Sequence, residues 1–158
     1  PQLYEALDSF PDLRFNIDIK TEDALENTIE IIKEMKCFHR ICLASFSSSR
    51  LKRIRELAGK EACTSSGQMD TFKLMCKSLG IAFKINSADC AQIPIKQWGV
   101  PILTERFLRE AKRNNKLVHV WTIDDKEEMF KLIDFGVDGI MTDKPSILKQ
   151  AMIERGLF

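Results

Sequence analysis

Two charged side chains, Asp18 and Lys20, stand two residues apart at the end of the apolar segment Leu13–Lys20. A carboxylate beside an ammonium group suits a site that holds a metal ion and an anionic group of a substrate. The same two residues would also make an ordinary ion pair on an edge strand. Both interpretations stay open at this level.

The segment that carries this pair alternates strictly between apolar and polar residues. Phe15, Ile17 and Ile19 would form one face of a strand, and Asn16, Asp18 and Lys20 the other. A strand inside an open doubly wound sheet has helices on both faces, which disfavours a face that is polar throughout. A barrel strand tolerates it, because its inner face ends at the catalytic side. The alternation therefore favours a barrel.

A second strand is predicted at Leu117–Ile123, where Val118, Val120 and Thr122 would face helices and His119, Trp121 and Ile123 would face inward. Trp121 would either wall a substrate pocket or belong to the core. His119, one layer deeper, is predicted to be a core histidine rather than a catalytic one. His39 falls in a helix-to-strand connection and is predicted to be structural.

Strand-like and helix-like segments alternate along the chain, with short connections. Besides the two strands above, strands are predicted at Ile41–Phe46, Glu61–Thr64, Ala91–Ile95 and Val137–Thr142. Helices are predicted at Thr21–Lys36, Ser47–Ala58, Gln68–Leu79, Thr104–Asn114 and Asp125–Phe135, with a last one opened by Pro145. This order indicates α/β architecture, a parallel sheet covered by helices in about five β/α units.

Composition excludes several classes of protein. The formal net charge of the 158 residues is +1, which offers no basic excess for nucleic acid, and no apolar run is long enough for a membrane helix. With 44% hydrophobic residues, the chain has the profile of a globular domain rather than a disordered tail.

Five cysteines without a C-x-x-C pair predict buried thiols in a reducing compartment. No signal region opens the chain, which favours a cytoplasmic location; Pro1 is not expected to be a native start, so an upstream segment or signal stays open.

Two further features have ordinary structural explanations. Arg50, Lys52, Arg53 and Arg55 occupy the polar positions of an amphipathic helix and are predicted to be solvated. The segment 64–67, Thr-Ser-Ser-Gly, could offer backbone N–H groups to an anion before a helix, but it lacks a glycine-rich phosphate-binding signature.

Three stretches together resemble the glycerophosphodiester phosphodiesterase family. They are residues 1–20, from Pro-Gln-Leu-Tyr-Glu-Ala-Leu to Phe-Asn-Ile-Asp-Ile-Lys; residues 44–47, Ala-Ser-Phe-Ser; and residues 118–145, from Val-His-Val-Trp-Thr-Ile-Asp to Thr-Asp-Lys-Pro. The order and spacing agree over essentially the whole chain. The resemblance implies a TIM barrel, (β/α)8, of which this chain would hold the C-terminal five or so units as a single partial domain, residues 1–158.

The resemblance also implies an activity and a set of site residues. The family hydrolyses glycerophosphodiesters to an alcohol and glycerol 3-phosphate with a divalent metal, so Ca²⁺ or Mg²⁺ is expected as the cofactor and a glycerophosphodiester or lysophospholipid as the small-molecule substrate. Asp18 would be the metal ligand, where the family usually has Glu. Lys20 would hold the phosphate, Trp121 would line the substrate pocket, and Phe46 would lie beside it.

The family's N-terminal histidine motifs and its Glu-x-Asp metal pair are absent. The sole His-Arg pair, His39-Arg40, precedes the wrong strand and has no acidic pair after it. We therefore expect no catalytic residue in this chain, and a C-terminal fragment that is inactive alone. Two alternatives remain: an aldolase-type barrel in which Lys20 forms a Schiff base, and a non-catalytic partial-barrel module.

Overall fold

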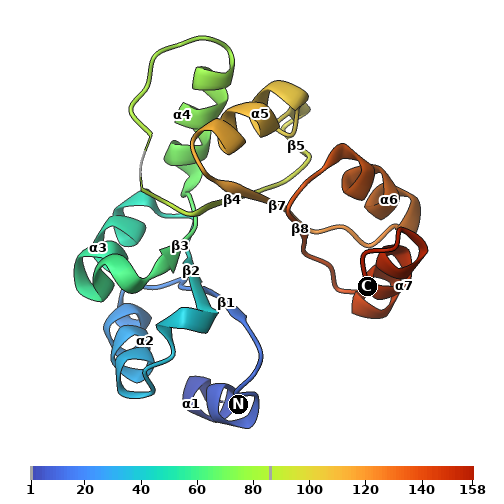
Figure 1. The fold of residues 1–158 in the computed structure, drawn as a ribbon. Coiled ribbons are helices and arrows are strands. Elements are labelled where there is room, and N and C mark those ends of the chain that lie inside the picture. Colours follow the sequence, from blue (N-terminus) through green and yellow to red (C-terminus); the bar gives the residue numbers. More distant parts are fainter. Residues whose placement is uncertain (1, 86) are drawn as a thin grey trace. The chain divides into compact units, whose positions relative to one another are not determined.

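The computed structural model describes residues 2–85 and 87–158, and it divides into two compact units. The first holds the chain up to Asp70 together with the short stretch that ends at Asp89. The second holds Thr71–Ile85 and Cys90–Phe158. Figure 1 shows the elements of both units along the chain.

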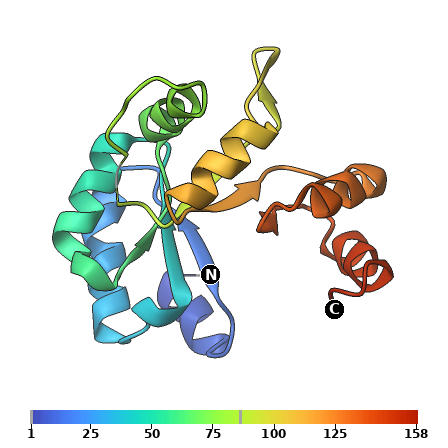
Figure 2. The same ribbon diagram turned by 45° about the horizontal axis from the view of Figure 1, so that its top comes forward.

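A three-stranded parallel sheet with the order β1-β2-β3 organises the first unit. Its strands are β1 (Phe15–Asp18), β2 (Ile41–Ala44) and β3 (Cys63–Thr64). The helices are α1 (Leu3–Ser9), α2 (Asp23–Glu34) and α3 (Ser48–Ala58), with 3₁₀ turns η1 (Phe38–Arg40) and η2 (Gly59–Glu61). Figures 1 and 2 show α2 and α3 on one side of this sheet.

The core of the first unit lies between the sheet and these helices. Leu25, Ile29 and Ile32 of α2 and Leu51 and Ile54 of α3 are buried in one cluster with apolar residues of the sheet, Ile19, Ile41 and Leu43. The helical spacing of these side chains puts them on the faces that meet the strands. The face of β1 that carries Asp18 is thereby left outside this core.

The short helix α1 was not predicted, because seven residues are fewer than two turns and carry little periodicity. Distant contacts hold it in place. Leu7 is fully buried in the core of the first unit. The Arg40 guanidinium donates hydrogen bonds to the carbonyl oxygens of Leu7 at 2.7 Å, Phe10 at 2.9 Å and Leu13 at 3.1 Å.

A second parallel sheet, in the order β4-β7-β8, organises the second unit. Its strands are β4 (Cys90–Ile93), β7 (Leu117–Val120) and β8 (Gly139–Ile140). The helices are α4 (Gln68–Ser78, which begins in the first unit), α5 (Glu105–Arg113), α6 (Lys126–Phe135) and α7 (Pro145–Glu154). Leu74, Phe107 and Met129 pack into one buried cluster with Val118 and Val120. No helix in the described residues is long and apolar enough to cross a membrane.

A small antiparallel hairpin, β5 (Lys96–Gln97) and β6 (Val100–Pro101), follows β4 and was not predicted. Its two-residue turn consists of Trp98 and Gly99, with φ angles of 49° and 80°. Two positive φ angles match the twist of a hairpin but favour Gly, Asn or Asp, not a bulky side chain. Trp98 nevertheless occupies the turn, and it is 93% exposed.

The predicted alternation of strands and helices is confirmed, and the six parallel strands in the described residues correspond to the six strands predicted from the sequence. A closed eight-stranded barrel is not formed by these residues. The inward and outward assignment at the end of β7 was wrong: Ile123 joins the buried cluster with Val118 and Val120, and Thr122 is exposed. The strand ends at Val120, so strict alternation stops there.

The same aspartate device precedes two strands. Before β4, Asp89 donates its backbone N–H to the Thr64 carbonyl and accepts the Thr64 N–H on its carboxylate, both at 2.8 Å. Before β8, Asp138 does the same with Val118, at 2.9 and 2.8 Å. The side chain of each aspartate thus adds one hydrogen bond at the start of its strand. It also accepts the backbone N–H of a buried residue, which would otherwise be unpaired.

Replacing Asp138 with Ala should lower the free energy of unfolding by about 1–3 kcal/mol, because the N–H of fully buried Val118 loses its acceptor. Urea denaturation followed by circular dichroism measures this loss. Asp138→Asn keeps an acceptor oxygen and should lose less, whereas exposed Asp12→Ala should change little. Equal losses for Asp138→Ala and Asp12→Ala would contradict the assignment.

Candidate active site

Asp18 and Lys20 lie at the carboxyl end of β1, and their side chains meet. Lys20 Nζ is 3.0 Å from Asp18 Oδ2, and the side chains are 76% and 30% exposed respectively. The alternation of β1 is as predicted, since Ile19 between them is buried in the core. The structure thus brings together the two charged residues that the sequence placed on one face.

The backbone between Asp18 and Lys20 is fixed by β2 and α3. The Ile19 N–H donates to the Ala44 carbonyl at 2.8 Å, which continues the β1–β2 ladder past its last paired residues. The Ile19 carbonyl accepts two further hydrogen bonds, from Ser45 Oγ at 2.9 Å and from Arg50 Nη1 at 3.1 Å. Arg50 Nη1 also donates to Ser45 Oγ at 3.0 Å. We call Ser45, Arg50 and the Ile19 carbonyl the strand-end clamp.

The prediction that Arg50 and Arg55 lie on a solvated helix face was wrong. The Arg50 side chain is 15% exposed and also bonds Glu22 at 2.9 Å. Arg55 is half-buried and donates to Thr64 Oγ1 and the Ser65 carbonyl, both at 2.9 Å, and burial lowers its pKa. Lys52 and Arg53 are exposed as predicted. Charge patterning along a helix could not distinguish these pairs, because the acceptors come from distant loops.

Phe46 follows β2 at the same edge of the sheet. Asp18 pairs in register with Ala44, and Phe46 comes two residues after Ala44 as Lys20 comes two residues after Asp18. Its side chain is 53% exposed. An exposed aromatic ring at a strand end suits contact with a ligand better than core packing. Ser47, the next residue, caps α3 by accepting the Arg50 N–H at 3.2 Å.

Trp121 lies at the corresponding strand ends of the second unit. It follows β7, and its N–H donates to the carbonyl of Ile93, the last residue of β4, at 3.1 Å. Its side chain is half-buried. Trp121 belongs to the second unit, whereas Asp18, Lys20 and Phe46 belong to the first.

His119 lies deeper in β7, as predicted, and packs against the neighbouring strand. It pairs in register with Gly139, where an added Cβ would stand 2.8 Å from His119 Cδ2. Gly139 is therefore required by the close approach of the imidazole ring. His39 lies in η1, before β2 and so away from the strand ends that carry Asp18 and Phe46. Neither histidine stands at a strand's carboxyl end.

The Thr-Asp-Lys-Pro stretch joins the ends of β7 and β8 through Asp124. Its Oδ1 accepts from Thr142 Oγ1 at 2.8 Å and from the Asp143 N–H at 2.9 Å. Thr142 Oγ1 in turn accepts the Lys144 N–H at 2.9 Å. The hydrogen bond from Thr142, aided by that from Asp143, lowers the pKa of Asp124. Sequence reasoning had missed this role of Asp124.

The segment 64–67 does not offer an open anion cradle. The N–H of Thr64 is taken by Asp89, that of Ser65 by the Leu43 carbonyl at 3.0 Å, and that of Gly67 by Asp70 at 3.4 Å. Gly67 also lies against the start of α3, where an added Cβ would be 2.6 Å from Ser48 Oγ. The backbone N–H groups of Thr64, Ser65 and Gly67 are therefore occupied by contacts within the fold.

The metal ligand predicted at Asp18 stands alone among the described residues. No group of three or more His, Cys, Asp and Glu side chains that could hold a metal ion occurs in residues 2–85 and 87–158. A calcium ion takes six to eight oxygen ligands, and magnesium requires six. Asp18, whose carboxylate already faces Lys20, does not by itself make such a site.

Comparison with known proteins shows which family the chain belongs to. The profile of the glycerophosphoryl diester phosphodiesterase family matches residues 2–147. The chain belongs to this family. It is 35% identical over 161 aligned residues to a Mycobacterium tuberculosis protein named probable glycerophosphodiester phosphodiesterase 2, covering 99% of this chain and 61% of the relative. A glycerophosphodiester phosphodiesterase of Caldanaerobacter subterraneus subsp. tengcongensis is 25% identical, with 94% and 60% covered.

Crystal structures of family members have the same fold. A glycerophosphodiester phosphodiesterase from Parabacteroides distasonis superposes with a TM-score of 0.75 at 23% identity, over 97% of this chain and 63% of its own. An Oleispira antarctica phosphodiesterase, solved with the product sn-glycerol-3-phosphate, superposes with a TM-score of 0.69 at 17% identity, with 97% and 61% covered. The chain thus spans about three fifths of the curated relatives that it matches.

Replacing Arg50 with Met should destabilise the chain by about 1.5–3 kcal/mol, because the buried strand-end clamp loses charge-assisted hydrogen bonds. Urea denaturation measures the change. Arg53→Met is the matched control on the same helix: its 53% exposed ion pair with Glu26 should be worth at most about 1 kcal/mol. If the two variants lost the same stability, the clamp would not be the stabilising contact.

Asp124→Asn should remove a pH dependence of stability. A carboxyl whose folded pKa is lowered stabilises the fold above its unfolded pKa, and this contribution is lost as the pH falls through the folded pKa. The difference in unfolding free energy between the native chain and Asp124→Asn should therefore be present at neutral pH and shrink in acid. Denaturation curves across the acidic range measure it; a difference independent of pH would contradict the assignment.

Proposed function

We propose that the complete protein hydrolyses glycerophosphodiesters to an alcohol and glycerol 3-phosphate, and that this chain contributes the substrate-binding strand ends. The observation that carries the proposal is family membership across residues 2–147, with 35% identity to a relative over 99% of the chain. Family members named as glycerophosphodiester phosphodiesterases, one solved with glycerol 3-phosphate, support this substrate class.

In this proposal Lys20 holds the phosphate of the substrate. Its ammonium group has three N–H donors, and the contact to Asp18 at 3.0 Å directs one of them. The other donors are available to phosphate oxygens, because the Lys20 side chain is 76% exposed. Neutralising a phosphodiester anion lets a nucleophile approach it. Asp18 would orient Lys20, and the strand-end clamp would hold the backbone of both.

Phe46 and Trp121 are proposed to contact the organic part of the substrate. Phe46 is exposed and Trp121 is half-buried, and each comes within two residues of the end of a strand of its own unit. Apolar walls with few polar groups are usual in small-molecule sites. The size of the alcohol group, including the long chain of a lysophospholipid, would then be set by these rings and the loops beside them.

General acid and base groups are not assigned to this chain. His39 lies before β2, and His119 packs on Gly139, so neither is positioned to exchange a proton with a ligand at Lys20's strand end. We infer that the proton-transferring groups belong to the portion of the relatives that this chain does not match, and that the isolated chain does not turn over substrate. Metal dependence, with Ca²⁺ or Mg²⁺, also requires oxygen ligands in addition to Asp18.

The Schiff-base alternative is disfavoured by the surroundings of Lys20. Nucleophilic lysines are desolvated or placed beside another cation, which favours the neutral amine. Lys20 is largely exposed and its ion-pair partner is a carboxylate, so neither condition is met at its side chain.

A chimera tests the proposed function. The matching segment of the Mycobacterium tuberculosis relative is replaced by this chain, and release of glycerol 3-phosphate from glycerophosphocholine is measured. We expect release that stops with a chelator and returns with Ca²⁺ or Mg²⁺. Lys20→Ala should lower the rate by about 10²–10³-fold, as loss of one charge-stabilising donor does in other active sites.

Exposed Lys60→Ala is the matched control and should leave the rate unchanged. The intact relative serves as the positive control, and circular dichroism checks that the chimera is folded. A folded chimera that releases nothing with any of Ca²⁺, Mg²⁺ or Mn²⁺, while the intact relative is active, would overturn the assignment. So would full activity of the Lys20→Ala chimera.

A further inference from the structure

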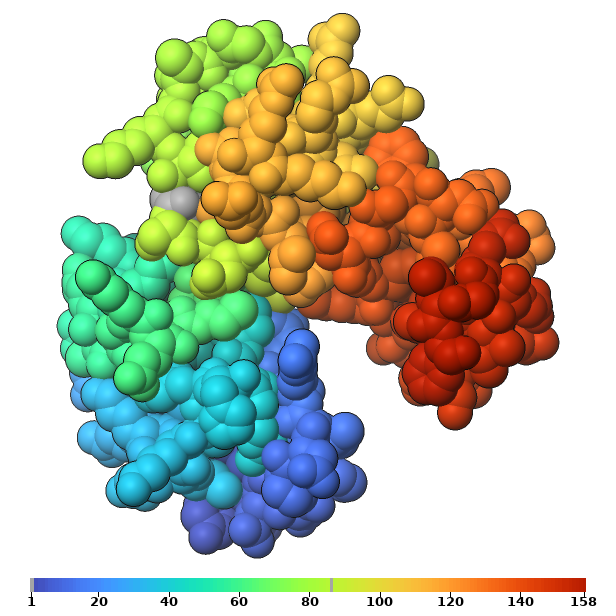
Figure 3. All heavy atoms as spheres, viewed as in Figure 1, coloured from blue at the N-terminus to red at the C-terminus, as the bar shows by residue number. Residues whose placement is uncertain are grey.

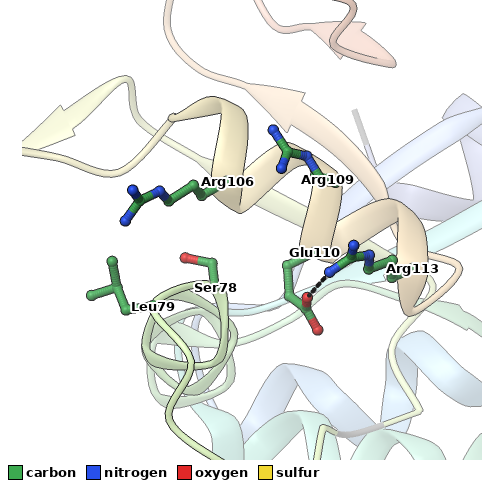
Figure 4. A pocket seen from close by; sticks show the side chains of 6 residues that line it. All are labelled: Ser78, Leu79, Arg106, Arg109, Glu110 and Arg113. Atoms are coloured by element: carbon green, nitrogen blue, oxygen red, sulfur yellow. Dashed lines mark ion pairs between the residues drawn. The ribbon is translucent and has the colours of Figure 1, made fainter.

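A basic hollow of about 240 Å³ lies between α4 and α5 in the second unit. Figure 3 shows the atoms of these two helices in direct apposition, and Figure 4 shows the side chains that line the hollow. The lining residues are Ser78, Leu79, Arg106, Arg109, Glu110 and Arg113. None of them belongs to the strand ends described above, so the hollow is separate from the candidate active site.

The carboxylate of Glu110 lines the hollow, and its negative charge is already paired with cations of the protein. Glu110 is 3.4 Å from Lys77 Nζ and 3.6 Å from Arg113 Nη1, and it accepts a hydrogen bond from Asn114 Nδ2 at 2.9 Å. Burial would raise the pKa of Glu110, but these hydrogen bonds and cations together lower it. Glu110 therefore stays ionised and is neutralised by Lys77 and Arg113.

Arg106 and Arg109 have no such partner. Both are exposed, and neither guanidinium group makes an ion pair or hydrogen bond with any residue that the structure describes. Their positions on α5, three apart and then four apart from Arg113, put three guanidinium groups on one helix face. Like charges at these spacings destabilise a helix by a few tenths of a kcal/mol per pair. In Figure 4 the Arg106 side chain extends on the side of the hollow where Ser78 and Leu79 lie.

We propose that this hollow binds a phosphate-type oxyanion through Arg106 and Arg109. Guanidinium groups bind phosphate oxygens with two parallel hydrogen bonds, and an anion here would relieve the repulsion along α5. The Ser78 hydroxyl already donates to the Met75 carbonyl at 2.6 Å, so the arginines supply the donors. The proposal is independent of the function proposed above, because it uses no residue of that site.

The oxyanion has two possible sources with the same chemistry, a soluble phosphate monoester and the headgroup of a phospholipid. A soluble phosphate monoester and a headgroup such as that of phosphatidic acid both present a terminal phosphate to a pair of guanidinium groups. They differ in whether the phosphate is free in solution or fixed at a surface, and the experiment separates them.

The folded 158-residue chain is titrated with inorganic phosphate at constant ionic strength, and the arginine Nε–H signals are followed by NMR. We expect saturable shifts at Arg106 and Arg109, with chloride producing none. The double variant Arg106→Gln/Arg109→Gln should weaken the affinity about tenfold or more, as the loss of hydrogen bonds between charged groups implies. In a second arm, sedimentation is measured with vesicles of phosphatidylcholine, with and without phosphatidic acid.

Arg14→Gln/Lys60→Gln is the matched control: it removes the same charge from exposed residues of the first unit and should bind as the native chain does. Arginine-dependent phosphate binding without vesicle capture identifies a soluble monoester, and arginine-dependent capture by phosphatidic acid identifies a headgroup. Equal weakening in both double variants would indicate general charge attraction and overturn the proposal. Failure of both phosphate and vesicles to bind would also overturn it.

Discussion

The Arg50 guanidinium and the Ser45 hydroxyl both donate to the carbonyl oxygen of Ile19, at 3.1 and 2.9 Å. Without these two donors, the carbonyl would lie beyond the last paired residues of β1, where strands open locally. The strand-end clamp holds the backbone beyond the last hydrogen bonds between β1 and β2, which fixes the direction in which Lys20 follows the sheet. Because Arg50 lies in the first turn of α3 and Ser45 directly follows β2, one β/α unit determines how its neighbour presents a charged side chain.

Asp89 and Asp138, which precede β4 and β8, add hydrogen bonds at the starts of these strands. Short strands of two to four residues have few ladder hydrogen bonds, and a carboxylate that accepts a backbone N–H supplies one more. The same solution recurs in both units, once with Thr64 and once with Val118. Strand starts are thus tied by aspartates, and the end of β1 by an arginine.

The sequence predicted well what depends on local periodicity. The helices from α2 to α7 and the strand pairs follow apolar spacing and capping residues such as Ser47, Thr104 and Asp125, which all accept an N–H three residues on. The sequence did not predict features that depend on contacts between residues far apart in the chain. Helix α1 depends on Arg40, the buried arginines of α3 depend on loops, and the hairpin after β4 is too short for a period. The pairing of Asp18 with Lys20 was predictable because both residues share one strand face.

The chain contains two tryptophans, and they stand in opposite surroundings. Trp98 is 93% exposed at the hairpin turn, whereas Trp121 is half-buried at the end of β7. Indole fluorescence shifts to longer wavelength in water, so the emission of the native chain is the sum of a solvated fluorophore and a shielded one. Because no contact of the core depends on Trp98, removing its ring leaves a chain with a single optical reporter at the end of β7, where a ligand of the proposed site would change its surroundings.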